Sequence, residues 1–240
     1  MKQDFAVKST VDEIRARFDQ EVARFSNLET GQQTTIDAPV CLDLITRAAQ
    51  LVNPAARSLL DVGCGAGNYS LKMLSRLPGL DCSLLDLSGP MLAKAQERVR
   101  AATTGTVATW QGDIRDLDFP PGHFDIILAG AVFHHLRTEE EWEAVFSKLY
   151  RILKPGGSLW ISDLVEQETA PLNELFREKY SEYLEQLGGM AYKDHVLAYI
   201  GREDTPRSLT FQLNLLQQAG FKQVEVLHKN LCFAAFGGIK

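Results

Sequence analysis

The chain has 240 residues, of which 45% are hydrophobic and 23% charged, a balance typical of a folded globular domain and not of a disordered or fibrous protein. Its formal net charge of −6 argues against a general nucleic-acid binder, which needs Lys and Arg to neutralise phosphates. No CxxC spacing and no histidine at metal-ligand spacing accompany the cysteines, so we expect neither a disulfide framework nor a metal site.

The amino-terminal stretch, residues 1–18, carries charges every few residues and lacks the apolar core of a signal peptide. No run approaches the roughly 20 apolar residues that span a bilayer. We therefore expect a soluble, cytoplasmic protein without a membrane partner. A homodimer stays an open alternative.

The first predicted elements are helical. Apolar residues at steps of three and four predict one helix over residues 11–25, and a second helix over 38–52 should end at Asn53-Pro54. We expect residues 1–53 to form a helical cap on a single domain that spans 1–240.

Strands and helices then alternate over residues 55–165. We predict strands at 58–63, 80–87, 106–113, 124–132 and 158–165, and helices at 68–77, 89–102 and 139–153. Strands that alternate with helices of about a dozen residues predict βαβ units, and hence an α/β fold with a parallel sheet.

The last part of the chain breaks this alternation. Residues 166–206 predict two helices around Gly188-Gly189, inserted as a lid where a short crossover would be expected. Residues 207–240 predict a helix that ends at Gly220 and two closing strands with a turn near Lys229-Asn230.

The glycine-rich stretch LLDVGCGAG, residues 59–67, joins the first strand of this alternation to its helix. In a doubly wound sheet, ligands bind beyond the carboxyl ends of the strands, at such a turn. The spacing is GxGxG rather than the dinucleotide fingerprint GxGxxG. Asp61 at the strand end would repel a pyrophosphate and suit a cationic ligand.

At these residues the chain resembles the class I S-adenosylmethionine-dependent methyltransferases, over about residues 55–165. The resemblance implies a Rossmann-like, doubly wound, seven-stranded and mostly parallel sheet with an antiparallel last strand. It implies S-adenosyl-L-methionine as cofactor and S-adenosyl-L-homocysteine as product. Gly63, Gly65 and Gly67 would lie along the methionine and ribose, with Asp61 near the amino group, and Cys64 in the same turn is a further candidate contact to the cofactor. Because no base or second cysteine accompanies Cys64, we expect a small apolar filler and not a reactive thiol.

Three later strand ends extend the resemblance. Asp86 would accept hydrogen bonds from both ribose hydroxyls, and Leu87 and Met91 would be apolar walls for adenine. In the stretch GDIRD, which begins at Gly112, Asp113 would accept the adenine amino hydrogen and the Ile114 amide would face a ring nitrogen. In AGAVFHH, the small residues Ala129 and Gly130 would leave space for the methyl group.

His134 follows the fourth strand near the expected methyl position and is a candidate general base. The alternative is that this imidazole only packs at a helix start. In the inserted helices, Arg177, Tyr180, Tyr199 and Arg202 are candidate contacts to the substrate, although aromatic residues at helical spacing also indicate packing.

We therefore expect an enzyme that transfers a methyl group in line to a small-molecule acceptor, mainly by positioning the reactants. One alternative rests on a likeness of ARFDQEVARFSNL, GDIRD and LHKNLCFAAFGGIK to carboxy-S-adenosylmethionine synthase, which modifies the cofactor for tRNA wobble modification. Arg202 or Arg207 would then hold the added carboxylate. A non-catalytic cofactor-binding module is a third possibility. A nucleic-acid methyltransferase is disfavoured, because AGAVFHH replaces the Asn/Asp-Pro-Pro-aromatic signature.

Overall fold

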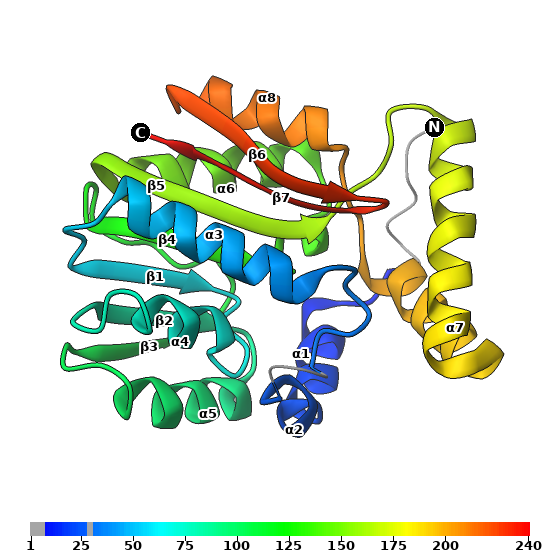
Figure 1. Cartoon of the computed structure of the whole chain (residues 1–240), viewed down its shortest axis with the longest axis horizontal. Coiled ribbons are helices and arrows are strands. Elements are labelled where there is room, and N and C mark those ends of the chain that lie inside the picture. Colours follow the sequence, from blue (N-terminus) through cyan, green and yellow to red (C-terminus); the bar gives the residue numbers. More distant parts are fainter. Residues whose placement is uncertain (1–7, 28–30) are drawn as a thin grey trace.

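The computed structural model describes residues 8–27 and 31–240, within which seven strands form one sheet in the order β3-β2-β1-β4-β5-β7-β6 (Figure 1). The strands β1 to β5 pair in parallel with one another, and β7 is antiparallel to both β5 and β6. The predicted α/β fold, mostly parallel with an antiparallel last strand, is confirmed. The strands are β1 (Ser58–Val62), β2 (Asp81–Asp86), β3 (Val107–Gln111), β4 (Phe124–Gly130), β5 (Leu153–Leu164), β6 (Gln223–Asn230) and β7 (Phe233–Ile239).

The central strand β4 shows why the sheet is buried on both faces. Its consecutive residues Ile126 and Ile127 are fully buried and belong to two different hydrophobic clusters, one on each face of the sheet. Neighbouring residues of a strand point to opposite faces, so an unbroken apolar run suits a strand covered on both sides. Helices must therefore cover both faces.

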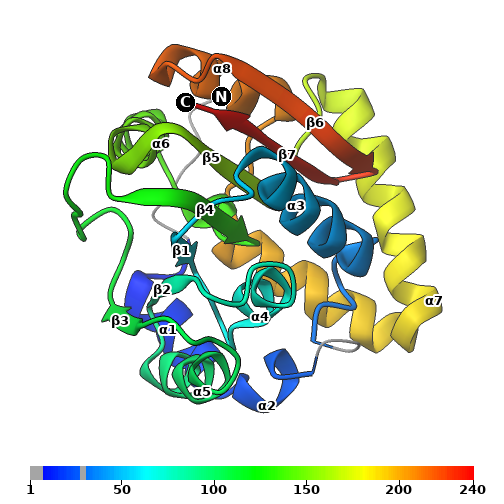
Figure 2. The same ribbon diagram turned by 60° about the vertical axis from the view of Figure 1, so that its left-hand side comes forward.

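Helices α3, α4 and α5 pack on one face of the sheet, and α6 and α8 on the other (Figure 2). Ser88, Thr138 and Ser208 cap the amino ends of α5, α6 and α8 by accepting a backbone N–H bond. The helical elements are α1 (Val11–Asp19), α2 (Val22–Phe25), α3 (Ala38–Val52), α4 (Asn68–Leu74), α5 (Gly89–Arg100), the 3₁₀ turn η2 (Phe133–His135), α6 (Glu139–Ile152), α7 (Ala170–Glu203) and α8 (Leu209–Ala219).

The single helix predicted over residues 11–25 is wrong, because the chain breaks between α1 and α2. Thr10 and Glu13 form a capping box at the start of α1, and the backbone leaves helical geometry at Glu21. The rings of Phe18 and Phe25 lie 5.8 Å apart. In a continuous helix these residues would be about 10.5 Å apart along the axis, so the break brings both rings to one place.

The inserted segment forms two helices, as predicted, which meet at the non-helical Gly189 inside α7. Tyr180, Leu184 and Val196 from its two halves pack on Leu164, the last residue of β5, and on Phe233, the first residue of the antiparallel β7. The final hairpin turns at Leu231 and Cys232, two residues later than predicted, with Leu231 in a left-handed conformation. No helix among residues 8–27 and 31–240 is long and apolar enough to cross a membrane.

Candidate active site

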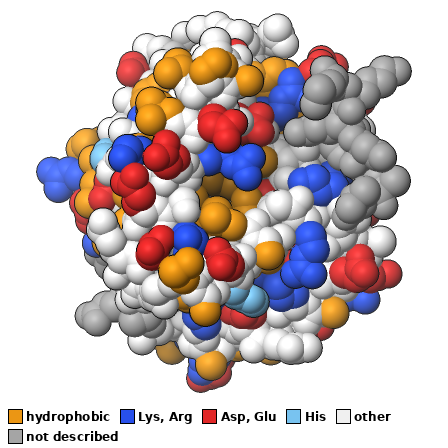
Figure 3. All heavy atoms as spheres, turned by 90° about the vertical axis from the view of Figure 1, so that its right-hand side faces the viewer, with side chains coloured by type: hydrophobic (Ala, Val, Ile, Leu, Met, Phe, Trp, Pro, Cys, Tyr) orange, Lys and Arg blue, Asp and Glu red, His pale blue; other side chains and the backbone are white. Residues whose placement is uncertain are grey.

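A cavity opens beyond the carboxyl ends of the parallel strands, between the sheet and the cap formed by α1, α2 and α7. Figure 3 shows this side of the molecule, hollowed at its centre, with apolar side chains inside and charged side chains of both signs around it. The strand order reverses between β1 and β4, which is where a doubly wound sheet binds its ligand.

The glycine-rich turn after β1 forms one wall of this cavity. Gly63, Gly65 and Gly67 all have left-handed backbone angles, with φ of 62°, 50° and 83°. A Cβ at Gly63 would lie 2.3 Å from Val132 Cγ2, whereas a Cβ at Gly65 would meet nothing within 4 Å. Gly63 therefore allows close packing, and Gly65 leaves its backbone open to a ligand. Gly67 is not among the described residues that line the cavity.

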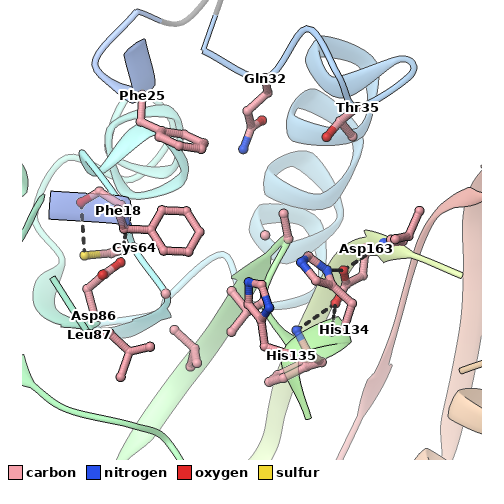
Figure 4. Close-up of a pocket in the computed structure, with 18 of the residues that line it drawn as sticks. Phe18, Phe25, Gln32, Thr35, Cys64, Asp86, Leu87, His134, His135 and Asp163 are labelled. Atoms are coloured by element: carbon pink, nitrogen blue, oxygen red, sulfur yellow. Dashed lines mark hydrogen bonds and ion pairs between the residues drawn. The ribbon is translucent and has the colours of Figure 1, made fainter. Parts of the chain in front are cut away.

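Asp86 stands at the end of β2 and lines the cavity (Figure 4). One carboxylate oxygen accepts the Gly65 N–H at 2.8 Å and the other accepts the Ser88 N–H at 2.9 Å. The side chain thus connects the glycine-rich turn to the start of α5. Burial raises the pKa of Asp86 despite these donors.

Asp61 lies beneath the turn rather than on the cavity wall, which corrects the expectation that it faces the ligand. It is 1% exposed, and it accepts hydrogen bonds from the Ser70 hydroxyl at 2.6 Å and the Ser70 amide at 3.1 Å. Burial raises its pKa to about 7. The carboxylate holds the first turn of α4 against β1.

The predicted adenine end of the site lines the cavity. Leu87, Met91, Gly112, Asp113 and Ile114 all contribute to the wall. However, Arg115 donates two hydrogen bonds to the Asp113 carboxylate, one from Nε at 3.0 Å and one from a terminal nitrogen at 2.6 Å. If Asp113 binds adenine, its carboxylate therefore has to accept that hydrogen bond in addition to the two from Arg115.

The small residues at the end of β4 have a different use from the one expected. Ala129 does not line the cavity among the described residues, whereas Gly130 does. A Cβ at Gly130 would lie 2.3 Å from the ring of Tyr69. The missing side chain thus accommodates this buried ring rather than a methyl group.

Cys64 lines the cavity next to the open Gly65. Burial raises the pKa of its thiol, with the Asp86 and Asp61 carboxylates acting in the same direction. A thiol held in its neutral form is a weak nucleophile. Cys64 therefore fits the predicted role of an apolar filler.

His134 lines the opposite wall, in the 3₁₀ turn after β4 (Figure 4). Its Nδ1 pairs with the carboxylate of Asp163 from β5, which also accepts the Phe133 amide at 2.8 Å. Burial opposes a charge on this ring, but the carboxylates of Asp163 and Asp204 outweigh it and raise the pKa of His134 to about 9. The raised pKa favours the protonated form of the ring, which is a poor general base.

His135 and Asp204 lie beside His134. The Asp204 Oδ1 is 3.7 Å from His134 Nε2 and 3.4 Å from His135 Nδ1. Burial and the neighbouring His134 hold the pKa of His135 well below its usual range, so its ring is neutral. Sequence spacing predicted no metal site, yet the fold gathers two imidazoles and a carboxylate on the cavity wall.

The cap closes the cavity with side chains from α1, α2 and α7. Arg17 of α1 binds the Glu203 carboxylate with its Nε at 2.8 Å and its terminal nitrogen at 2.5 Å. The rings of Phe18 and Phe25 face the cavity from the same side. The end of α7 is thereby attached to α1.

Of the four predicted substrate contacts, Tyr180 and Tyr199 line the cavity. The Tyr180 hydroxyl is already engaged, because it donates to the Thr34 carbonyl at 2.8 Å. Arg177 and Arg202 do not line the cavity in the described part of the chain, which corrects the expectation for both.

Sequence reasoning missed several residues of the wall. Phe18 and Phe25 were assigned to an ordinary amphipathic helix, and Asp163 to the end of a buried strand. For Asp163 the sequence did offer a sign of function, because it is the only charged residue in the apolar stretch SLWISDLV. Asp204 carried no signal.

A methyltransferase domain model matches residues 59–157, which include the glycine-rich turn, Asp86, Asp113 and His134. The chain is 24% identical over 213 residues to a malonyl-[acyl-carrier protein] O-methyltransferase of Paenibacillus, covering 88% of this chain and 71% of that protein. It is 28% identical over 189 residues to the carboxy-S-adenosyl-L-methionine synthase of Shewanella baltica, covering 76% of this chain and 75% of that protein.

The fold is similar to that of magnesium protoporphyrin IX methyltransferase from Synechocystis, solved with bound S-adenosylhomocysteine. The TM-score is 0.66 at 16% sequence identity, over 96% of this chain and 100% of that one. At this identity the likeness supports the fold alone.

Proposed function

We propose that this chain, a class I S-adenosylmethionine-dependent methyltransferase, transfers the methyl group to a small-molecule acceptor held between the cofactor and the cap. The observation that carries the proposal is the cavity itself. It joins the glycine-rich turn and Asp86 on one wall to His134 and the aromatic cap residues on the other.

The cofactor half of the cavity suits a nucleoside without phosphates. At the turn, the open backbone of Gly65 lies beside the Asp86 carboxylate, an acidic hydrogen-bond acceptor on the cavity wall. A sulfonium and an ammonium group are attracted there, whereas a diphosphate is repelled. The ribose would lie against Asp86, and the adenine between Leu87, Met91 and Ile114.

Methyl transfer from a sulfonium is a displacement with an activated leaving group, so it asks mainly for alignment. Holding two reactants in a near-attack geometry contributes about 7–11 kcal/mol, while a general base adds a factor of about 10²–10⁴. Because Asp163 holds the Nδ1 of the His134 ring, this ring is better placed to orient the acceptor than to remove its proton.

Calorimetry with S-adenosylhomocysteine tests the cofactor half. The substitution Asp86→Ala should weaken binding about 10–150-fold, the equivalent of the 1.5–3 kcal/mol typical of a hydrogen bond to a charged group. Asp81→Ala at the other end of β2 is the matched control and should leave affinity unchanged, because the Asp81 carboxylate accepts hydrogen bonds from Thr106 and is not among the described residues that line the cavity. NADH should not displace the nucleoside. Equal affinities for the two variants would remove Asp86 from the site.

Acceptor turnover tests the transferase half. Wild-type protein incubated with S-adenosylmethionine and a set of small hydroxyl, amine and thiol compounds should release S-adenosylhomocysteine in the presence of at least one of them. A chain that binds the cofactor tightly but never turns over would instead be a binding module.

The likeness to carboxy-S-adenosyl-L-methionine synthase supports a second candidate, an enzyme that alters the cofactor itself. Neither Arg202 nor Arg207, the expected holders of a carboxylate, lines the cavity among the described residues. Arg207 instead pairs with Glu139 at 2.5 Å and stacks on Phe211. Mass spectrometry of the ligand released from purified protein separates the two candidates, since the carboxylated cofactor is heavier.

A further inference from the structure

We propose that His134, His135 and Asp204 bind one divalent transition-metal ion on the acceptor side of the cavity. The binding of the ion stands on the geometry of these residues alone. The role given to it below, to hold the acceptor, rests on the proposed methyl transfer.

The spacing of the candidate ligand atoms suits a small ion. Ligand atoms about 2.1 Å from a tetrahedral zinc ion lie about 3.4 Å from one another. Asp204 Oδ1 lies 3.4 Å from His135 Nδ1 and 3.7 Å from His134 Nε2, and the candidate ligand atoms all fall within 4.8 Å of one another. Only small side-chain shifts separate this arrangement from a coordination sphere.

The His134 ring is oriented as a metal-binding histidine is. Asp163 occupies Nδ1 and leaves Nε2 facing Asp204 and the cavity. Metal-binding histidines almost always donate their second ring N–H to a carboxylate, a carbonyl or water, which fixes the ring and its tautomer. The Asp163 carboxylate is itself fixed by the Phe133 amide at 2.8 Å.

Charged side chains of both signs surround the cluster. Asp163, Asp204 and Glu203 supply negative charge around the cluster, and Glu203 is balanced by Arg17. Arg137 approaches from the other side, where it donates to the Thr205 hydroxyl at 2.7 Å. Asp163 and Asp204 thus place negative charge against the two imidazoles, and Arg17 and Arg137 place positive charge near the same cluster.

Three protein ligands leave a coordination position open, as in catalytic rather than structural zinc sites. All three residues line the cavity, so the open position faces the space between the cap and the expected methyl group. An acceptor with an oxygen donor atom would bind there directly. The ion would fix that atom in line with the sulfonium, which is the alignment that the transfer needs.

The competing explanation is a network of hydrogen bonds and protons without an ion, in which His134 sits as a cation between Asp163 and Asp204. Both explanations use the same atoms, so only a direct measurement of metal binding separates them. The full chain should be treated with a chelator, dialysed, and titrated with Zn²⁺ alone by calorimetry and with Co²⁺ alone by visible absorption.

We expect one ion per chain and a Co²⁺ spectrum of low coordination number. His135→Ala and Asp204→Asn should each weaken binding by at least about tenfold, and Asp163→Asn, which loosens the His134 ring, by about 10–100-fold. His228→Ala is the matched control, because His228 also pairs with an aspartate, Asp37 at 2.9 Å, but lies outside the cavity. It should bind the ion as the wild type does.

Absence of binding to the wild-type chain would overturn the proposal. So would equal affinities for wild type, His135→Ala and Asp204→Asn, provided that melting curves show both variants to be folded. Titration of the metal-free chain with S-adenosylhomocysteine separates this result from the proposed function. A chain that binds the nucleoside but no metal keeps the transferase proposal and loses only the metal site.

Discussion

The two walls of the cavity are built in different ways. The wall proposed for the cofactor consists of short strand ends, each of which carries its lining residues within a few positions of the chain: the turn around Gly65, Asp86 with Leu87, and Gly112 to Ile114. The acceptor wall joins Arg17, His134, Asp163 and Asp204, which come from four distant segments. Local sequence therefore specifies the first wall, whereas only the assembled fold specifies the second.

The largest effect that we expect concerns the acid buried under the cofactor wall. Burial raises the pKa of Asp61 from 3.8 to about 7, so the folded state keeps a proton that the unfolded chain loses. The wild type should therefore lose stability relative to Asp61→Asn as pH rises from about 4 to 7, by on the order of 4 kcal/mol, and the difference should level off above pH 7. Urea unfolding of both proteins at several pH values measures it, and a pH-independent difference would mean that Asp61 is ionised throughout.

A second prediction tests how tightly the cofactor wall is packed. Gly63→Ala places a Cβ against Val132 and forces a left-handed alanine, which should cost about 3 kcal/mol and weaken S-adenosylhomocysteine binding. Gly122 has the same φ of 62° but open space around it, so Gly122→Ala should cost only the backbone strain, about 1 kcal/mol. Similar losses for both would show that Val132 moves away easily.

The acceptor wall should be sensitive to a single long-range contact. Arg17→Ala leaves the Glu203 carboxylate, whose side chain is 5% exposed, without its partner, and should cost about 2 kcal/mol. Arg15→Ala on the same helix removes only an exposed pair with Asp12 and should cost less than about 0.5 kcal/mol. Thermal unfolding compares the two. If both variants melt alike, α1 does not depend on the end of α7.

The smallest effect is expected where α7 contacts the loop before α3. Tyr180→Phe removes a buried hydrogen bond to the Thr34 carbonyl and should cost about 1 kcal/mol, whereas Tyr183→Phe removes a more exposed bond to the Gln33 carbonyl and should cost less. Urea unfolding resolves this difference. The reverse order would indicate that the Tyr180 hydroxyl is free to serve the acceptor.

Most of the fold was predictable from the sequence, because each element carries a local signal. Apolar runs marked β1, β2 and β4, and Gly189 and Gly220 marked the breaks in the helical segments. The break between α1 and α2 had no such signal. It depends on contacts far along the chain, among them the Asp19 carboxylate that accepts the Ser88 hydroxyl at 2.6 Å.

The site divides in the same way. Leu87, Met91 and Ile114 were placed correctly on the cavity wall by their position after a strand, but their contacts with a ligand stay predictions. Arg177 and Arg202 were misplaced because helical spacing does not tell which face of an inserted helix turns inward. Asp204 could not be found, since it follows α7 and reaches His135 only because that helix doubles back at Gly189.

The attachment of α1 to the end of α7 links access to the two walls. Besides Arg17 and Glu203, the Ser9 amide donates to the Arg202 carbonyl at 2.9 Å, and Lys8 donates to the Asp204 carbonyl at 2.6 Å. A displacement of α1 that lets a nucleoside enter or leave would therefore also displace Asp204, the third residue of the cluster with His134 and His135. Under the proposed function, one movement of α1 would then open the cavity both for exchange of the cofactor and for release of the acceptor.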